Sequence, residues 1–288
     1  MGTILEVTDL SKRYRNSEFH LDNVSFSVPS GTIMGFVGEN GAGKTTTIGC
    51  ILNTLIKDSG TVQIFGKEMT DAATDIRDDI GVVYDTNPFP QNFTAGKISA
   101  GMRHIYSNWD SVLFRNYLRQ FKLPEKQKIK EFSRGMTMKL AIAVALSHRP
   151  RLLVLDEATS GLDPIVRDDI LDALLDFVQD ENRSVLFSSH ITSDLEKVAD
   201  YITFIHDGNI LFSEKKDVLK YSYGMMRCKA SQFADMDRRD ILAYRKHDYQ
   251  IDVLVADKEA MARKYGGVVI DTITIEEMML ILVKGEKS

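Results

Sequence analysis

Short uninterrupted apolar runs recur along much of the chain, and polar turns bound each of them. Continuous apolar runs of this kind, as at Leu152–Asp156 and Ser184–Ser189, are typical of parallel strands that are buried on both faces. Loose alternation of apolar and polar residues near the N-terminus also predicts strands. The predicted strands lie at residues 3–9, Leu21–Val28, Thr32–Val37, Gly60–Gly66, Ile80–Tyr84, Leu152–Asp156 and Ser184–Ser189.

Helical patterns separate these strands. Thr45–Leu55 and Pro164–Val178 each follow a strand and have helical spacing of apolar residues. Residues 86–150 contain few strand-like runs and several helical stretches, among them Trp109–Phe121, so we predict a mostly helical insert there. Strands that alternate with helices indicate an α/β fold.

The pattern changes after a predicted hairpin. Tyr201–His206 and Asn209–Phe212 flank Asp207-Gly208, which is a strong hairpin signal. From there the chain mixes short strands (Ile251–Val255, Val268–Ile270) with helices, and Thr274 and Glu277 form a capping-box pattern. We predict a first domain at residues 1–221 and a small C-terminal accessory or regulatory appendage at residues 222–288.

Composition is that of an ordinary globular protein, with 43% hydrophobic and 27% charged residues among 288. The net charge of −5 argues against a nucleic-acid partner. The two cysteines form no C-x-x-C pair, and the N-terminus has no signal-peptide pattern, so we expect a reduced intracellular protein. No apolar run approaches the roughly 18 residues of a membrane span, so work at a membrane would need spans from another chain.

A glycine-rich stretch between a predicted strand and a predicted helix has the G-x-x-x-x-G-K-[ST] pattern of a phosphate-binding P-loop. Its glycines let successive backbone N–H groups face an anion, and the helix N-terminus adds its positive end. Lys44 places a charge on the outer phosphates, and the Thr45 hydroxyl can hold Mg²⁺. The predicted nucleotide-binding residues here are Gly38, Glu39, Asn40, Gly41, Ala42, Gly43, Lys44, Thr45 and Thr46.

Acidic residues and a histidine stand at the ends of two predicted buried strands. Asp156 ends Leu152–Asp156 and can hold Mg²⁺, whereas Glu157, pointing to the other side, can activate the attacking water as a general base. His190 follows Ser184–Ser189 and can link the γ-phosphate to Glu157. With Lys44, these two residues are the predicted catalytic set.

A second candidate anion site lies far from the P-loop in sequence. Ser133 and Gly135 open an apolar helix, so their hydroxyl and backbone N–H groups can bind phosphate. Ser160–Pro164 follows Asp156 by a few residues. One nucleotide does not need two such sites from one chain, whereas two chains facing each other head-to-tail would use both.

Together these motifs resemble the nucleotide-binding subunit of an ABC transporter, over about residues 3–215. The matching elements are the P-loop, a signature-like Phe132–Met136, the Walker B strand with Glu157, Ser160–Asp163 as the D-loop, and His190 as the switch histidine. Tyr14 falls where this family places an aromatic residue that stacks on adenine. The overall style looks like bacterial exporters of peptides, antibiotics or similar amphiphiles.

The resemblance implies an α/β P-loop NTPase core of mostly parallel strands, with an antiparallel β portion, a helical subdomain at about residues 86–150 and the C-terminal appendage. It also implies that ATP and Mg²⁺ bind and that ATP hydrolysis in a head-to-tail dimer drives transport. The expected partners are transmembrane permease subunits and a second ATPase subunit, identical or related, without nucleic acid. The expected location is the cytoplasm, peripheral on the inner face of the membrane.

The chain departs from the family pattern in two places. The signature usually reads Leu-Ser-Gly-Gly-Gln, but Arg134 replaces its first glycine and Met136 its glutamine, while Ser133 and Gly135 are kept. The strand Ile80–Tyr84 should lead to a glutamine, and Asp85 occupies that slot. An aspartate there can still reach Mg²⁺, so we predict Asp85 as a metal ligand.

Two other functions compete with transport. A soluble ABC-type ATPase that acts on ribosomes or DNA would usually carry two nucleotide domains or a long coiled coil, and this chain has one set of motifs and no heptad run. A P-loop kinase or GTPase would leave the signature-like segment unexplained.

Overall fold

A computed structural model describes residues 2–287. The chain forms two compact units. The N-terminal unit holds the chain up to Ala199 together with Ile205–Ile210, and the C-terminal unit holds Asp200–Phe204 and the chain from Leu211. The predicted α/β class is confirmed.

A parallel sheet forms the centre of the N-terminal unit. Its strands lie in the order β3 (Ile33–Val37), β8 (Ser184–Ser189), β7 (Leu152–Asp156) and β6 (Ile80–Tyr84). Every residue of β3, β7 and β8 is buried, which explains why their sequences are mainly apolar. Because parallel strands share one direction, the residues after β3, β7 and β8 emerge at one edge of the sheet.

An antiparallel sheet completes the β structure of this unit, in the order β2-β1-β4-β5. Its strands are β1 (Thr3–Arg13), β2 (His20–Pro29), β4 (Ser59–Ile64) and β5 (Lys67–Glu68). The prediction that the first strand ends at residue 9 is wrong, because β1 continues to Arg13 through register shifts on both sides of Leu10. Asp9 has a φ of 50° at this irregularity. The irregularity breaks the alternation of apolar and polar residues, so the sequence pattern does not show that the strand continues.

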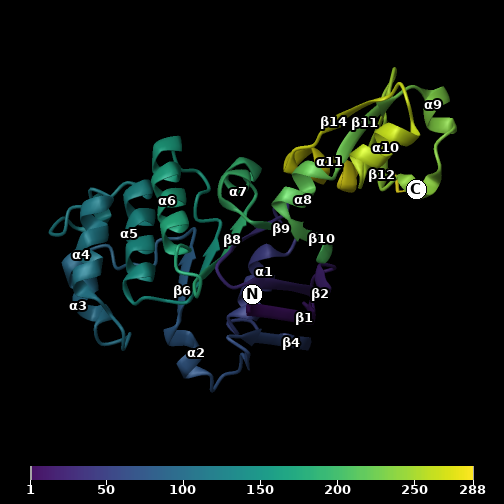
Figure 1. The fold of residues 1–288 in the computed structure, drawn as a ribbon. Helices are drawn as coiled ribbons and strands as arrows, with labels where there is room; N and C mark the ends of the chain where they lie inside the picture. The colour runs from purple at the N-terminus through teal and green to yellow at the C-terminus, as the bar shows by residue number, and fades with distance from the viewer. Residues whose placement is uncertain (1, 288) are drawn as a thin grey trace. The chain divides into compact units, whose positions relative to one another are not determined.

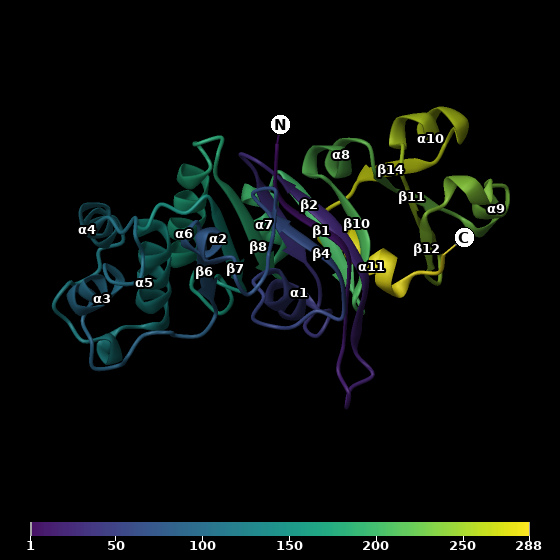
Figure 2. The ribbon, with the colours of Figure 1, turned by 90° about the horizontal axis from the view of Figure 1, so that it is seen from below.

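The helices from residues 86–150 lie on the side of the N-terminal unit away from the antiparallel sheet, where Figures 1 and 2 both show α3, α4 and α5 together. This confirms the predicted helical region within residues 86–150. The helices of the unit are α1 (Lys44–Ile51), α2 (Thr74–Asp78), α3 (Ala95–Met102), α4 (Ser111–Gln120), α5 (Arg134–Ser147), α6 (Pro164–Phe177) and α7 (Thr192–Val198), with a short 3-10 helix at Ile129–Glu131.

The helix after the P-loop is shorter than predicted, since α1 ends at Ile51 and not at Leu55. Asn53 has a φ of 55°, and the N–H groups of Thr54 and Leu55 turn back to the Gly49 carbonyl. A left-handed asparagine closes the helix end in this way, although the spacing of apolar residues continues past it.

The predicted hairpin and the elements after it are present. β9 (Tyr201–His206) and β10 (Asn209–Lys215) flank Asp207 and Gly208, whose φ values of 44° and 74° suit a tight hairpin turn. An antiparallel sheet follows in the order β12-β13-β11-β14. Its strands and the nearby helices are β11 (Gly224–Cys228), β12 (Ala243–Lys246), β13 (Ile251–Val255), β14 (Val269–Thr272), α8 (Lys216–Tyr221), α9 (Ala230–Ala234), α10 (Lys258–Lys264) and α11 (Ile275–Lys284), with a 3-10 helix at Arg238–Asp240.

The C-terminal unit has its own apolar core. Met226, Val253 and Tyr244 of the sheet pack with Phe233 of α9 and Met261 of α10. The predicted capping box of α11 is confirmed, because the Thr274 hydroxyl accepts the Glu277 N–H at 3.1 Å and Glu277 accepts the Thr274 N–H at 3.0 Å. Among residues 2–287, every helix is too short or too polar to cross a bilayer.

A buried histidine joins the helical region to the parallel sheet and makes stability depend on pH. His148 caps α5, lies within hydrogen-bond distance of the Ile80 carbonyl (3.2 Å) and stacks on Tyr106 with ring centroids 3.9 Å apart. Burial lowers the pKa of His148 below its usual 6.5. The unfolded chain therefore binds the proton first, so the contribution of His148 to stability is complete above about pH 6.5 and is lost as pH falls through the folded-state pKa.

We expect urea unfolding, followed by fluorescence of Trp109 in the same helical region, to show falling stability between pH 7.5 and 5.5. His148→Gln should flatten this pH dependence, whatever it does to stability at pH 7.5. His104→Gln, which changes an exposed histidine, should keep the wild-type slope. Equal slopes in wild type and His148→Gln would contradict the assignment.

Candidate functional site

The P-loop lies between β3 and α1, as the sequence predicts. Gly43, directly before α1, has a φ of 115°, and a Cβ there would come within 2.7 Å of Leu21. A Cβ on Gly38 would lie 2.5 Å from the Ile205 carbonyl oxygen. Glycine is thus required at both ends of the loop, by backbone conformation at Gly43 and by the close approach of the Ile205 backbone at Gly38.

Lys44 lies in the floor of this loop with 5% of its surface exposed. Its Nζ donates to the carbonyl oxygens of Gly38 at 2.7 Å and Glu39 at 3.1 Å. The same Nζ lies 3.1 Å from Oε1 of Glu157. These contacts hold a buried positive charge against the backbone of the P-loop.

Glu157 connects Lys44 to His190. Its Oε2 lies 2.6 Å from Nδ1 of His190, while its buried Oε1 accepts no hydrogen bond from the described residues despite the nearby ammonium group. Glu157 has a φ of 56°, and its N–H donates to the Ser188 carbonyl at 3.1 Å. The orientation of this side chain thus depends on a left-handed backbone turn, and not on the simple alternation of a strand that the sequence suggests.

Asp156, the last residue of β7, is 5% exposed and accepts a hydrogen bond from the Ser188 hydroxyl at 3.0 Å. Ser188 holds this carboxylate from the neighbouring strand β8, a role that sequence reasoning did not assign. The described residues contain no group of three or more acidic, histidine or cysteine side chains placed to hold a metal. Mg²⁺ in phosphate sites usually takes one or two carboxylates plus substrate oxygens and water, so a site of Asp156 with Thr45 fits this ion.

A pocket of about 420 Å³ opens above the P-loop. Its lining residues are Phe19, Asn40, Gly41, Gly43, Lys44, Thr45, Thr46 and Glu157. Glycine backbone, hydroxyl groups and the buried Lys44 make it suited to phosphates, and Glu157 places a carboxylate in its lining.

Two aromatic residues lie near this pocket. Tyr14 is 37% exposed, and its hydroxyl group is 3.5 Å from the Thr46 hydroxyl. Phe19 lines the pocket, and its ring would lie 3.0 Å from a Cβ on Gly43. Sequence reasoning missed Phe19, since no motif surrounds it.

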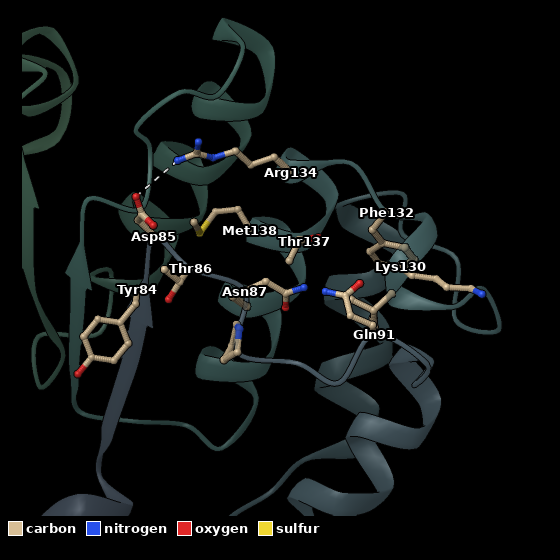
Figure 3. Close-up of a pocket in the computed structure, with 13 residues that line it drawn as sticks. Tyr84, Asp85, Thr86, Asn87, Gln91, Lys130, Phe132, Arg134, Thr137 and Met138 are labelled. Carbon is tan, nitrogen blue, oxygen red and sulfur yellow. Dashed lines mark ion pairs between the residues drawn. The ribbon is translucent and has the colours of Figure 1, made fainter.

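The other predicted site residues form a separate group. Ser133 caps α5, where its hydroxyl accepts the Met136 N–H at 3.1 Å, and Gly135 lies in the first turn against Val166. Among the described residues, those that line the P-loop pocket do not include Ser133, Gly135 or Asp85. Asp85 and Arg134 instead line a cavity of about 230 Å³ beside α5 (Figure 3).

The segment after Asp156 starts α6. Asp163 caps this helix and accepts the N–H groups of Ile165 at 3.1 Å and Val166 at 3.0 Å, with Pro164 in the first turn. One chain therefore has two separate sets of predicted site residues, the P-loop set around Lys44 and the signature set of Ser133 and Gly135. The signature set does not line the P-loop pocket of its own chain.

Comparison with known families matches residues 21–160 to the family described as ABC transporter. The chain is 34% identical to the bacitracin transport ATP-binding protein BcrA of Bacillus licheniformis, over 87% of this chain and 83% of that protein. It is 32% identical to the lantibiotic transport ATP-binding protein SrtF of Streptococcus pyogenes, over 74% of this chain and 92% of that protein.

Solved structures agree with these relatives. An ATP-binding subunit of an ABC transporter superimposes with a TM-score of 0.69 at 27% identity, covering 76% of this chain and 92% of that one. The cbiO1 protein of Clostridium perfringens has a TM-score of 0.64 at 22% identity over 75% of this chain and 89% of that one, which shows a shared fold.

Proposed function

The chain belongs to the ATP-binding proteins of ABC transporters, which bind and hydrolyse ATP, and from this we propose that it powers export of a peptide antibiotic or similar amphiphile. It works at the inner face of the cell membrane, with separate transmembrane subunits that supply the channel. The names of its bacitracin and lantibiotic relatives support this substrate class. They do not favour action on ribosomes or DNA.

The contact of Lys44, Glu157 and His190 is the observation that carries the hydrolytic mechanism. Lys44 holds the outer phosphates of ATP and exchanges its contact with Glu157 for phosphate oxygens. Glu157 then accepts a proton from the attacking water, because its carboxylate is released from Lys44 and the residue lines the phosphate pocket. His190 holds the other carboxylate oxygen and so fixes the direction of this base.

Mg²⁺ is the metal that this site suits. Thr45 and Asp156 would hold it, with Ser188 orienting the Asp156 carboxylate. When bound, Mg²⁺ neutralises charge on the phosphates. The role of Asp85 as a further metal ligand stays a prediction. Asp85 lines a separate cavity with Arg134 and does not line the P-loop pocket.

Two chains form the working ATPase. Ser133 and Gly135 supply anion-binding groups at the start of α5, and in a head-to-tail pair they reach the ATP held by the opposite P-loop. The second chain is a copy of this one or a related subunit. Residues 1–221 supply the ATPase domain, and residues 222–288 are accessory, since every nucleotide motif lies before them.

Affinity purification of the tagged full chain from detergent-solubilised membranes tests the assignment. We expect a polytopic membrane protein to co-purify, and cells that carry both proteins to accumulate less labelled bacitracin or lantibiotic than cells whose chain carries Glu157→Gln. Co-purification of ribosomal proteins without a membrane subunit would contradict the proposal. A membrane partner without any change in accumulation of either peptide would contradict the substrate class alone.

A further inference from the structure

Two oppositely charged side chains from distant parts of the sequence meet beside α5. Asp85 directly follows β6, and Arg134 is the first residue of α5. The Asp85 Oδ2 and Arg134 Nη2 atoms are 3.6 Å apart, and the dashed line in Figure 3 joins them. Both are places where the sequence departs from the pattern that it resembles, so the two departures form one ion pair.

The loop between β7 and α6 also contacts this pair. A Cβ on Gly161 would lie 3.1 Å from Nη1 and 3.3 Å from Cζ of Arg134, so the guanidinium group packs directly against the Gly161 backbone. Gly161 has a φ of 67°. The Arg134 side chain thus touches the segment after β6 and the segment after β7 from its position at the start of α5.

The position of Arg134 in the helix favours a nearby negative charge. It lies at the N-terminus of a helix, where the backbone already presents positive charge, so a cation there is unfavourable unless an anion is near. Asp85 supplies that anion in the separate chain. A triphosphate brought to Ser133 and Gly135 by a second chain would supply the same charge in the same place.

The pair is weak enough to open. The side chains of Arg134 and Asp85 are 53% and 45% exposed, and exposed ion pairs contribute little to stability because water screens them. A triphosphate carries more charge than one carboxylate and can accept the guanidinium group at two oxygens. It therefore competes successfully for Arg134 once it is close.

We propose that Asp85 and Arg134 form an exchangeable clasp, in which Asp85 holds Arg134 in the separate subunit and yields it to the ATP of the opposite subunit when the dimer closes. This proposal rests on the head-to-tail dimer proposed above. The clasp sets the ATP concentration at which the two chains associate. Arg134 is then a binding residue for the partner's nucleotide, and Asp85 is its competitor.

Sedimentation of the full chain across a range of ATP and Mg²⁺ concentrations tests the clasp, with Glu157→Gln as the parent so that ATP persists. Adding Asp85→Asn should lower the ATP concentration for half-maximal dimerisation about threefold, because Arg134 is released. Adding Arg134→Gln should raise it by at least a similar factor. Adding both should match Arg134→Gln alone, since Asp85 then has no guanidinium group to hold.

The double variant separates the clasp from a direct effect of Asp85 on the nucleotide or metal. If Asp85→Asn lowers the required ATP equally with and without Arg134, the clasp is wrong. The clasp is also wrong if the parent dimerises with ATP but adding Asp85→Asn to it, with Arg134 intact, does not change the ATP concentration required. Absence of ATP-dependent dimers in the parent would refute the head-to-tail dimer, and the clasp with it.

Arg149→Gln is a matched control. Arg149 has a guanidinium group of similar exposure, at 57%, and pairs with Asp110 at 2.8 Å in the same helical region. Its loss should leave the ATP dependence of dimerisation unchanged. Thermal unfolding of each variant should stay within a few degrees of the parent, because exposed pairs add little to stability. High salt should shrink the effect of Asp85→Asn.

Discussion

Glu157→Gln is expected to lower the rate of ATP hydrolysis by about 10²–10⁴-fold while ATP still binds, since general-base catalysis contributes about that much. Glutamine keeps the size of the side chain and can still hydrogen-bond to Nδ1 of His190. It cannot take a proton from water. It also has the same Cβ as glutamate, so the left-handed backbone at position 157 is no more strained than before.

Phosphate release under saturating ATP and equilibrium binding of labelled ATP measure the two parts of this expectation. ATP affinity should stay equal or rise, because the substitution removes a carboxylate that faces the phosphate pocket. Glu259→Gln, a change of an exposed glutamate in the C-terminal unit, should hydrolyse ATP at the wild-type rate. Hydrolysis by Glu157→Gln at near the wild-type rate would remove Glu157 from the mechanism.

Lys44→Ala is expected to weaken ATP binding itself, by about 10–100-fold, since a hydrogen bond to a charged group contributes about 1.5–3 kcal/mol. Lys44 is 5% exposed and held by the Gly38 and Glu39 carbonyl oxygens, so its charge reaches the phosphates with little screening. Its loss also leaves the Glu157 carboxylate without the ion pair at 3.1 Å. That unpaired negative charge then repels the phosphates.

A double variant tests this explanation. Lys44→Ala with Glu157→Gln should regain part of the lost ATP affinity, because the second change removes the unpaired charge. Lys44→Arg keeps the charge on a longer, planar group and should bind ATP better than Lys44→Ala. Thermal unfolding shows whether each variant is folded. Wild-type affinity in a folded Lys44→Ala would exclude Lys44 as a phosphate contact.

Several features of this protein follow from short stretches of its sequence. The P-loop is contiguous, so its glycine spacing predicts both the loop and the helix that follows it. β6, β7 and β8 have the bounds that their mainly apolar runs predict. Every residue of β7 and β8 is buried, which favours apolar side chains along most of each strand. Local hydrogen bonds likewise make the Thr274 capping box readable from sequence.

Other local features were not readable. The end of α1 depends on Asn53 adopting a left-handed conformation, and the extension of β1 depends on irregular pairing around Leu10. The first is closed by local hydrogen bonds to Gly49, and the second arises in pairing with β2. A pattern of apolar and polar residues carries no signal for them.

The tertiary structure decided how the predicted residues contact one another. Lys44, Glu157 and His190 meet because β3, β7 and β8 are parallel neighbours whose carboxyl ends share one edge, and because Glu157 takes a left-handed turn there. Asp85 and Arg134 were separate anomalies in the sequence, and the fold pairs them. Motifs fix the chemistry of single loops through local backbone geometry, whereas contacts between loops depend on strand order and packing, which join residues that no sequence spacing relates.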